Sequence, residues 1–402
     1  MQTTRPVEFI ALIAFLTALM AMSIDTMLPA MGQIATQLGA ANPNDRQFIV
    51  LGFFVGLTFG QLIFGPLSDS FGRKPIIYIG LVIYALGALT CMVSTNYTMM
   101  ILGRILQGFG GASPRVVSTA MVRDGAKGAD MARIMSFVMS VFMLVPILAP
   151  SIGQLVLYVA SWRYIFTGFV VASIIAGLWL GLRQSETLAR ENRHVFSPRD
   201  LWISAVLVVN NRVCLGYTLA AGFIFAAFTC YLGTSQQIFA DQYQQGDKFA
   251  LWFGGLAIAI AIAMVFNGYY VKKFGMRGIS KWAVRGFLLV WSLMMIACLM
   301  FAGHPPLLLL GLLLPWSFFF SGLTFGNINA LALEPMGKNA GMAAAISGFI
   351  SSLMAVVLGG GAGRMYDGTL YPISIAFLSL GILMWASMEW AERGRLVEKS
   401  GA

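Results

Sequence analysis

The sequence predicts an all-α membrane protein with twelve transmembrane helices in two six-helix bundles. The first observation is composition: 58% of the 402 residues are hydrophobic and 10% are charged, whereas soluble domains carry about 25% charged residues. The second is a series of long apolar runs, and the third is a weak internal repeat. A spanning helix needs about 20 mostly apolar residues, so this length holds roughly a dozen spans.

The expected spans are twelve apolar runs. They cover residues 8–30, 48–66, 75–94, 97–121, 133–158, 162–182, 213–237, 249–271, 282–303, 306–332, 341–363 and 370–391. The first run has the length of a signal peptide, but nothing after it looks like a soluble mature domain, so we expect it to be the first helix.

Basic residues set the expected orientation. With both termini in the cytoplasm, most of the 26 Lys and Arg residues fall in cytoplasmic segments, as the positive-inside rule requires. The same rule explains the net charge of +10 without a nucleic-acid partner. We therefore expect a multi-pass protein of the cytoplasmic membrane.

A polar interval divides the chain into two halves. We expect an N-terminal bundle over 1–182, a cytoplasmic linker over 183–212 and a C-terminal bundle over 213–402. GPLSDSFGRK (65–74) and GYYVKKFGMR (268–277) both follow the second span of their half, and their glycines align. Parallel repeats of this kind are typical of secondary transporters.

The residues of metal sites and enzymes are scarce. The four Cys residues lie in apolar runs without a C-x-x-C pair, and the two His residues lie in loops. No phosphate-binding G-x-x-x-x-G-K-[ST] motif occurs. Asp69 and Asp124 look isolated. We expect no metal, no cofactor and no enzyme activity, and a transport process driven by a gradient.

Three motifs carry a family resemblance. GPLSDSFGRKP (65–75) resembles the signature loop between helices 2 and 3 of the major facilitator superfamily. GRILQGFGGA (103–112) is similar to its fourth-helix motif, with matching residues Arg104, Gln107 and Gly108. LVPILAPSIGQ (144–154) resembles the fifth-helix motif of drug/proton antiporters, with matching residues Pro146, Ala149, Pro150 and Gly153. Together they look like Bcr/CflA-type drug-resistance transporters, although Ala149 and Gln154 replace two glycines of the antiporter pattern.

The signature loop has two interpretations. Gly65 and Gly72 are expected to end a helix and turn the chain, and Asp69 is expected to face the N-terminus of a neighbouring helix. Arg73 and Lys74 are expected to pair with carboxylates of the other half. The resemblance implies that this loop latches the outward-facing state. The alternative is an orientation signal combined with turn chemistry.

Asp25 and Arg104 are ionisable residues well inside expected spans. Asp25 is expected about 18 Å inside the outer end of the first helix if that helix continues to about Gln37. A buried carboxyl group favours its neutral form, so Asp25 is a candidate proton-coupling or substrate site. Alternatively, the helix stops at Pro29 and Asp25 lies at the wet interface. Arg104 is expected to tune the protonation of Asp25 or the substrate route, or else to bond Gln107 and backbone groups.

Small residues indicate close helix packing. The resemblance implies that the fifth span packs on the alternating alanines of the eighth span (257–263) across the two halves. Spans 2 and 11 carry stripes of small residues, at 52–60 and 343–363, and are expected to meet between the halves. Candidates for the substrate cavity are Asn327, Asn329, Phe228 and Tyr231.

The expected function is proton-coupled export of small amphipathic compounds by alternating access, as in multidrug efflux and antibiotic resistance. The partners are a small-molecule substrate, protons and the lipid bilayer, and the protein is expected to be a monomer. The alternative is a narrow-specificity metabolite exporter, or an uptake symporter, of the same fold.

Overall fold

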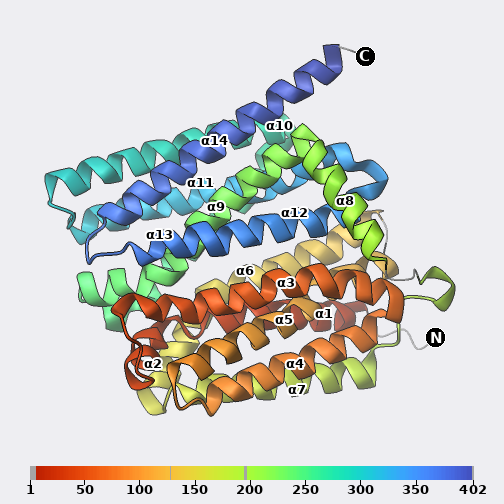
Figure 1. The fold of residues 1–402 in the computed structure, drawn as a ribbon, viewed down its shortest axis with the longest axis horizontal. Helices are drawn as coiled ribbons and strands as arrows, with labels where there is room; N and C mark the ends of the chain where they lie inside the picture. The colour runs from red at the N-terminus through yellow and green to blue at the C-terminus, as the bar shows by residue number, and fades with distance from the viewer. Residues whose placement is uncertain (1–5, 127, 194–196, 401–402) are drawn as a thin grey trace. The chain divides into compact units, whose positions relative to one another are not determined.

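A computed structural model describes residues 6–126, 128–193 and 197–400 of the chain. The regular secondary structure of the described residues is entirely helical, and these residues form two compact units that divide between Ser197 and Pro198. Figure 1 labels the helices of both units.

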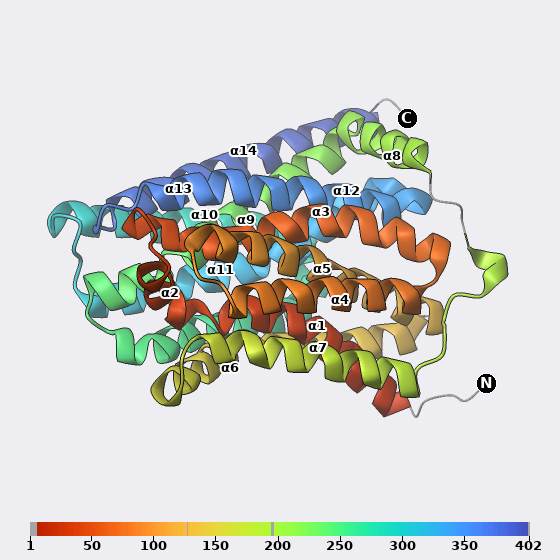
Figure 2. The ribbon, with the colours of Figure 1, turned by 60° about the horizontal axis from the view of Figure 1, so that its bottom comes forward.

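The first unit contains seven α-helices and three short 3-10 segments within the described residues. These are α1 (Pro6–Asp25), η1 (Leu28–Ala30), α2 (Met31–Gln37), η2 (Pro43–Gln47), α3 (Phe48–Phe71), α4 (Arg73–Met92), α5 (Tyr97–Gly125), α6 (Gly128–Val159), α7 (Arg163–Arg183) and η3 (Arg190–Asn192). Helices α3 and α4 both pack on α5, α4 also packs on α7, and α1 packs on α6. Figure 2 shows α4, α5 and α7 running side by side.

The second unit is also built from helices over its described part. These are α8 (Pro198–Asn210), α9 (Arg212–Gln236), η4 (Gln237–Gln242), η5 (Gly246–Lys248), α10 (Phe249–Met300), α11 (Leu307–Leu333), η6 (Glu334–Asn339), α12 (Ala340–Met354), η7 (Ala355–Gly359), α13 (Gly360–Arg364) and α14 (Tyr371–Ser400). Helix α9 contacts α11, α12 and α14, and α10 packs on α11. Segments η4 and η7 are π-helical.

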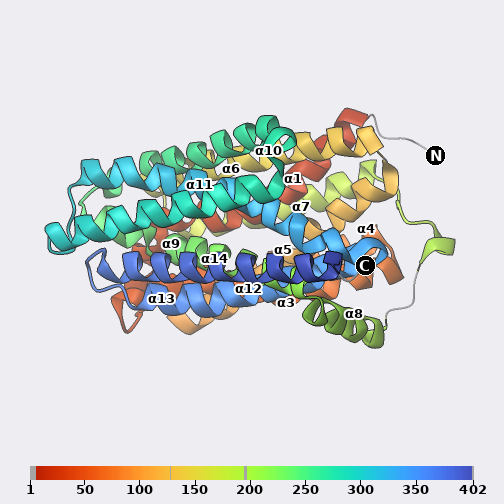
Figure 3. The ribbon, with the colours of Figure 1, turned by 90° about the horizontal axis from the view of Figure 1, so that it is seen from above.

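The predicted twelve spans are confirmed in the described residues. Ten segments are long and apolar enough to cross a membrane. One of them, Gly246–Met300, holds two spans, because α10 bends at Gly275, and Figure 3 shows its two halves as separate rods. The twelfth is α5, whose charged residues lower its hydropathy although its 29 residues exceed the length of a span.

Glycines allow the close packing inside the first unit. A Cβ atom on Gly56 would lie 1.9 Å from the Ile105 carbonyl oxygen, and one on Gly108 would lie 1.9 Å from that of Phe53. The small-residue stripe of the second span therefore faces α5 within its own unit. In the second unit, Ser347 and Gly359 of the other stripe face α9. The small residues of both stripes allow close helix packing within their own unit. The sequence predicted a contact between the two halves and did not predict this packing within each half.

Part of the predicted linker 183–212 is helical. Helix α8 lies within it and packs on α12 and α9. Asn211 has an extended backbone and separates α8 from α9. Figure 1 shows that α8 turns sharply away from α9 at this point.

Candidate functional site

The signature loop is built around one glycine turn. Helix α3 ends at Phe71, Gly72 has φ 104° and ψ 157°, and α4 begins at Arg73. Side chains other than hydrogen rarely tolerate this backbone conformation, so glycine is required there. Gly65 lies inside α3, and the prediction that it ends the helix is wrong. Gly72 alone turns the chain.

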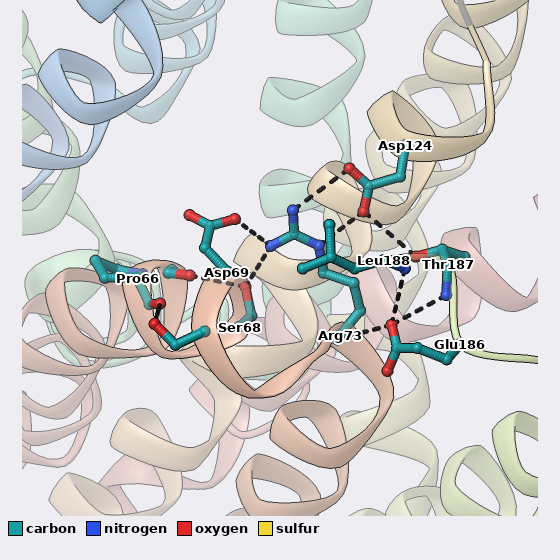
Figure 4. Close-up of polar contacts among 10 residues, drawn as sticks. Pro66, Ser68, Asp69, Arg73, Asp124, Glu186, Thr187 and Leu188 are labelled. Atoms are coloured by element: carbon teal, nitrogen blue, oxygen red, sulfur yellow. Dashed lines mark hydrogen bonds and ion pairs between the residues drawn. The ribbon is translucent and has the colours of Figure 1, made fainter. Parts of the chain in front are cut away.

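Arg73 connects the loop to the end of α5. Its side chain is 3% exposed and pairs with Asp69 at 2.5 Å and with Asp124 at 2.8 Å. It also donates to the Ser68 hydroxyl at 2.7 Å. Figure 4 shows the guanidinium between these groups. The partners of Arg73 therefore lie in its own unit, and the interpretation of Asp69 and Asp124 as isolated acids is wrong.

Lys74 and Glu186 connect the loop to the chain after α7. The Lys74 ammonium donates to the carbonyl oxygens of Gly181 and Gln184 at 3.1 and 2.7 Å. The Glu186 carboxylate accepts from the backbone N–H groups of Arg73 and Lys74 at 2.9 and 3.1 Å. These are the first N–H groups of α4, which have no partner within the helix, and the N-terminal end of a helix favours an anion. Glu186 therefore caps α4.

Glu186 was missed in the sequence. Its carboxylate also accepts from its own neighbours, the N–H groups of Thr187 and Leu188, both at 3.0 Å, so it is held from two sides (Figure 4). The available signal was an acidic residue directly after the sixth apolar run. An acidic residue at this place does not indicate which residue it contacts, because Glu186 and Arg73 lie more than a hundred positions apart in the sequence.

The second unit repeats the glycine turn. Gly275 has φ 71° and ψ 156°, close to the geometry of Gly72. Arg277 follows it at the same offset as Lys74 and pairs with Glu334 and Glu392. Glu392 also accepts from Tyr217 at 2.6 Å and pairs with Arg395 at 2.9 Å. The backbone of the repeat is the same in both units, while its charges differ.

The first span is broken beside Asp25. Helix α1 ends at Asp25, the 3-10 segment η1 contains Pro29, and α2 continues to Gln37. The observed form therefore combines the two alternatives: the helix is interrupted, and the span continues beyond the interruption. Asp25 is 6% exposed. Within the described part of the chain, no hydrogen bond or ion pair involves its carboxylate.

Arg104 lies in a cage of neutral oxygens. Its side chain is fully buried and donates to Gln107 Oε1 at 2.6 Å, to the Ile49 carbonyl at 2.9 Å and to the Ser23 carbonyl at 3.1 Å. The guanidinium also lies 4.7 Å from the Phe53 ring centre. These bonds to Gln107 and to backbone carbonyls are the ones expected if Arg104 has a structural role. Arg104 reaches α1 at Ser23, two residues before Asp25.

The fifth-helix motif packs against the broken helix. Pro146 and Pro150 lie inside α6 without ending it. Ala149 packs on Ala18, Ala21 and Val145. A Cβ atom on Gly153 would lie 1.8 Å from the Thr26 carbonyl oxygen, so this glycine allows α6 to touch the chain directly after Asp25.

The four cavity candidates differ in environment. Asn327 is buried and donates to Asn267 Oδ1 at 2.7 Å, whereas Asn329 is exposed and bonds the carbonyl of Phe325. Phe228 and Tyr231 both contact the Phe318 ring, at 6.3 and 4.7 Å between centres. The two asparagines therefore do not share one site.

Comparison with known proteins gives one family. Residues 11–391 match the family model described as Major Facilitator Superfamily. A bicyclomycin resistance protein homolog from Haemophilus influenzae is 29% identical over 375 residues, which covers 91% of each chain. The multidrug resistance protein MdtL of Klebsiella pneumoniae is 26% identical and covers 89% of this chain and 90% of its own. Among solved structures, a D-xylose-proton symporter has a TM-score of 0.74 at 15% identity, over 94% of this chain and 97% of that one.

Proposed function

The chain belongs to the Major Facilitator Superfamily, and we propose that it is a proton-coupled exporter of small amphipathic compounds. The family consists of transporters, not enzymes, and the protein is a multi-pass membrane protein that moves small-molecule substrates as a secondary transporter. Export, proton coupling, the cytoplasmic location of both termini and the monomeric state belong to the proposal.

The observation that carries the proposal is the buried carboxylate of Asp25. It lies at a break in a spanning helix, and no described residue bonds or pairs with it. An ionisable group in a span is energetically costly and is therefore a functional candidate by default, and interrupted helices are typical of coupling sites. Asp25 takes up a proton from the outside and releases it inward as substrate leaves.

Arg104 and Gly153 support this role from two sides. Arg104 holds α1 at the Ser23 carbonyl, and Gly153 allows α6 to contact Thr26. Both contacts fix the chain within three residues of Asp25. These two contacts hold the backbone on both sides of Asp25 in place, so a change in the protonation of Asp25 acts on a fixed backbone conformation.

The signature loop acts as the conformational latch in this proposal. Its glycine turn, its buried Arg73 and the Glu186 cap make the start of α4 rigid. A rigid turn transmits movement of one helix to the next, which rocking between two states requires. The second candidate function, uptake or narrow metabolite export, is favoured only by the shared fold, whereas the names of the relatives favour drug export.

The test is dye efflux from preloaded cells that express the protein. Wild type is compared with Asp25→Asn, with Asp130→Asn as the matched control at an exposed acid, and with wild type in the presence of a protonophore. We expect the protonophore and Asp25→Asn to abolish efflux, and Asp130→Asn to leave it unchanged. Efflux that survives Asp25→Asn but not the protonophore refutes the role of Asp25. Accumulation of the dye inside the cells against its own concentration gradient indicates uptake instead of export.

A further inference from the structure

Helix α8 has one buried face and one uncovered apolar face. Ser204 and Val208, four residues apart, are 7% and 0% exposed on the face that packs on α12 and α9. Trp202, Val206 and Val209 are 71%, 39% and 51% exposed. At about 3.6 residues per turn, these three side chains lie on the side opposite Ser204 and Val208. The outward face is therefore apolar.

This helix is too short to be a span. Its apolar part, Leu201–Asn210, has fewer residues than the about 20 that cross a bilayer. A helix of this length with apolar residues outward is neither a membrane crossing nor an ordinary solvated linker. The position of α8 along the membrane normal decides whether lipid or water covers its outward face.

The depth of α8 in the membrane follows from Arg212, the first residue of α9. Arg212 donates to the Trp390 carbonyl at 2.9 Å, and its guanidinium lies 5.0 Å from the Trp390 ring centre. In the same region, Glu389 pairs with Lys281 and Glu392 pairs with Arg277. Tryptophan beside basic residues is typical of the membrane–water interface. The C-terminal end of α8 is therefore fixed at the charged end of the second unit.

We propose that α8 lies in the bilayer interface, with its outward face on the lipid and Arg199 at anionic headgroups. Trp202, Val206 and Val209 insert at the boundary between headgroups and acyl chains, where an amphipathic helix binds by its apolar area. Arg199 is exposed at the start of the helix, and basic residues near anionic lipid strengthen binding. The inference requires the membrane family but not the proposed substrate.

The experiment places a fluorescent probe on the outward face. The cysteines of the chain are buried, so Val206→Cys labels selectively in the folded protein, and Val209→Cys serves if that variant does not fold. The labelled protein is reconstituted in vesicles that contain lipids with a quenching doxyl group near the glycerol backbone or at the chain end. Glu191→Cys, exposed outside α8, is the matched control for a solvated position.

We expect the probe at position 206 to be quenched most by the shallow doxyl lipid and protected from aqueous iodide. Doxyl-phosphatidylglycerol should quench better than doxyl-phosphatidylcholine, and Arg199→Gln should reduce that preference about fivefold. Iodide access equal to that at position 191 overturns the proposal. Energy transfer between labelled molecules without lipid quenching also overturns it, because the face then contacts a second copy. An unchanged lipid preference in Arg199→Gln refutes the headgroup contact.

Discussion

The Glu186 cap gives a measurable contribution to the stability of the first unit. Glu186→Gln keeps the size of the side chain but removes its charge from the N-terminus of α4. Oε1 of Glu186 accepts from the Arg73 N–H at 2.9 Å and Oε2 accepts from the Lys74 N–H at 3.1 Å, and the glutamine places an NH₂ group, which cannot accept, at one of these two positions. Charge at a helix terminus contributes about 0.3–1 kcal/mol, and bonds to charged groups exceed neutral ones by about 1 kcal/mol. The expected loss is about 2 kcal/mol.

The assay follows one buried thiol. Cys91 is the cysteine of the first unit, whereas Cys214, Cys230 and Cys298 lie in the second. A background with the last three replaced by alanine reports unfolding of the first unit through the reaction of Cys91 with a fluorogenic maleimide during heating. A loss of about 2 kcal/mol lowers the midpoint by about 4–8 °C in a unit of this size.

The control is Glu191→Gln, which removes the same charge from an exposed position of the same segment. Its midpoint is expected to stay at that of the background. If both variants keep the midpoint of the background, the cap adds nothing to stability and the reasoning is refuted. If both midpoints fall by the same amount, the effect is one of net charge rather than of the hydrogen bonds of the cap.

Three further predictions concern the packing around the candidate site. Arg104→Lys cannot reproduce three bonds in different directions and should lower both the thermal midpoint and dye efflux; unchanged efflux with a lowered midpoint makes Arg104 purely structural. Gly153→Ala forces a Cβ atom onto the Thr26 carbonyl and should cost about 1–3 kcal/mol, whereas Gly168→Ala, with open space around it, should cost little; equal midpoints contradict the contact. Gly72→Ala should cost about 1–3 kcal/mol through backbone strain, measured by the Cys91 reaction, and a midpoint at the wild-type value contradicts it.

The fold was predictable because lipid imposes a simple rule. A long apolar run satisfies its own backbone hydrogen bonds in lipid as a helix, so the number and order of the spans follow from the apolar runs along the sequence. The glycine turn at Gly72 and its repeat at Gly275 were also visible, since a shared offset after the second span of each half aligned them. Both turns have the same backbone geometry in the structure.

The interaction partners of the side chains were less predictable than the positions of the helices and turns. Asp124 and Glu186 looked unremarkable in sequence, because their contacts with the signature loop depend on how α5 and α7 end in space. The interruption after Asp25 left the run apolar, so hydropathy could not reveal it. Helix α8 was hidden for a related reason: a short apolar run beside basic residues fits a linker as well as a helix.

The two glycine turns also differ in how many cations hold the neighbouring helix ends. In the first unit, Arg73 holds the end of α5 while Lys74 holds the end of α7, so loss of one cation leaves the other tie intact. In the second unit, Arg277 pairs with both Glu334, after α11, and Glu392 in α14. Loss of Arg277 therefore breaks two ion pairs at once, although Lys281 still pairs with Glu389 of α14 and Tyr217 still donates to Glu392. The first unit divides its two contacts between two cations, whereas the second unit places both on one.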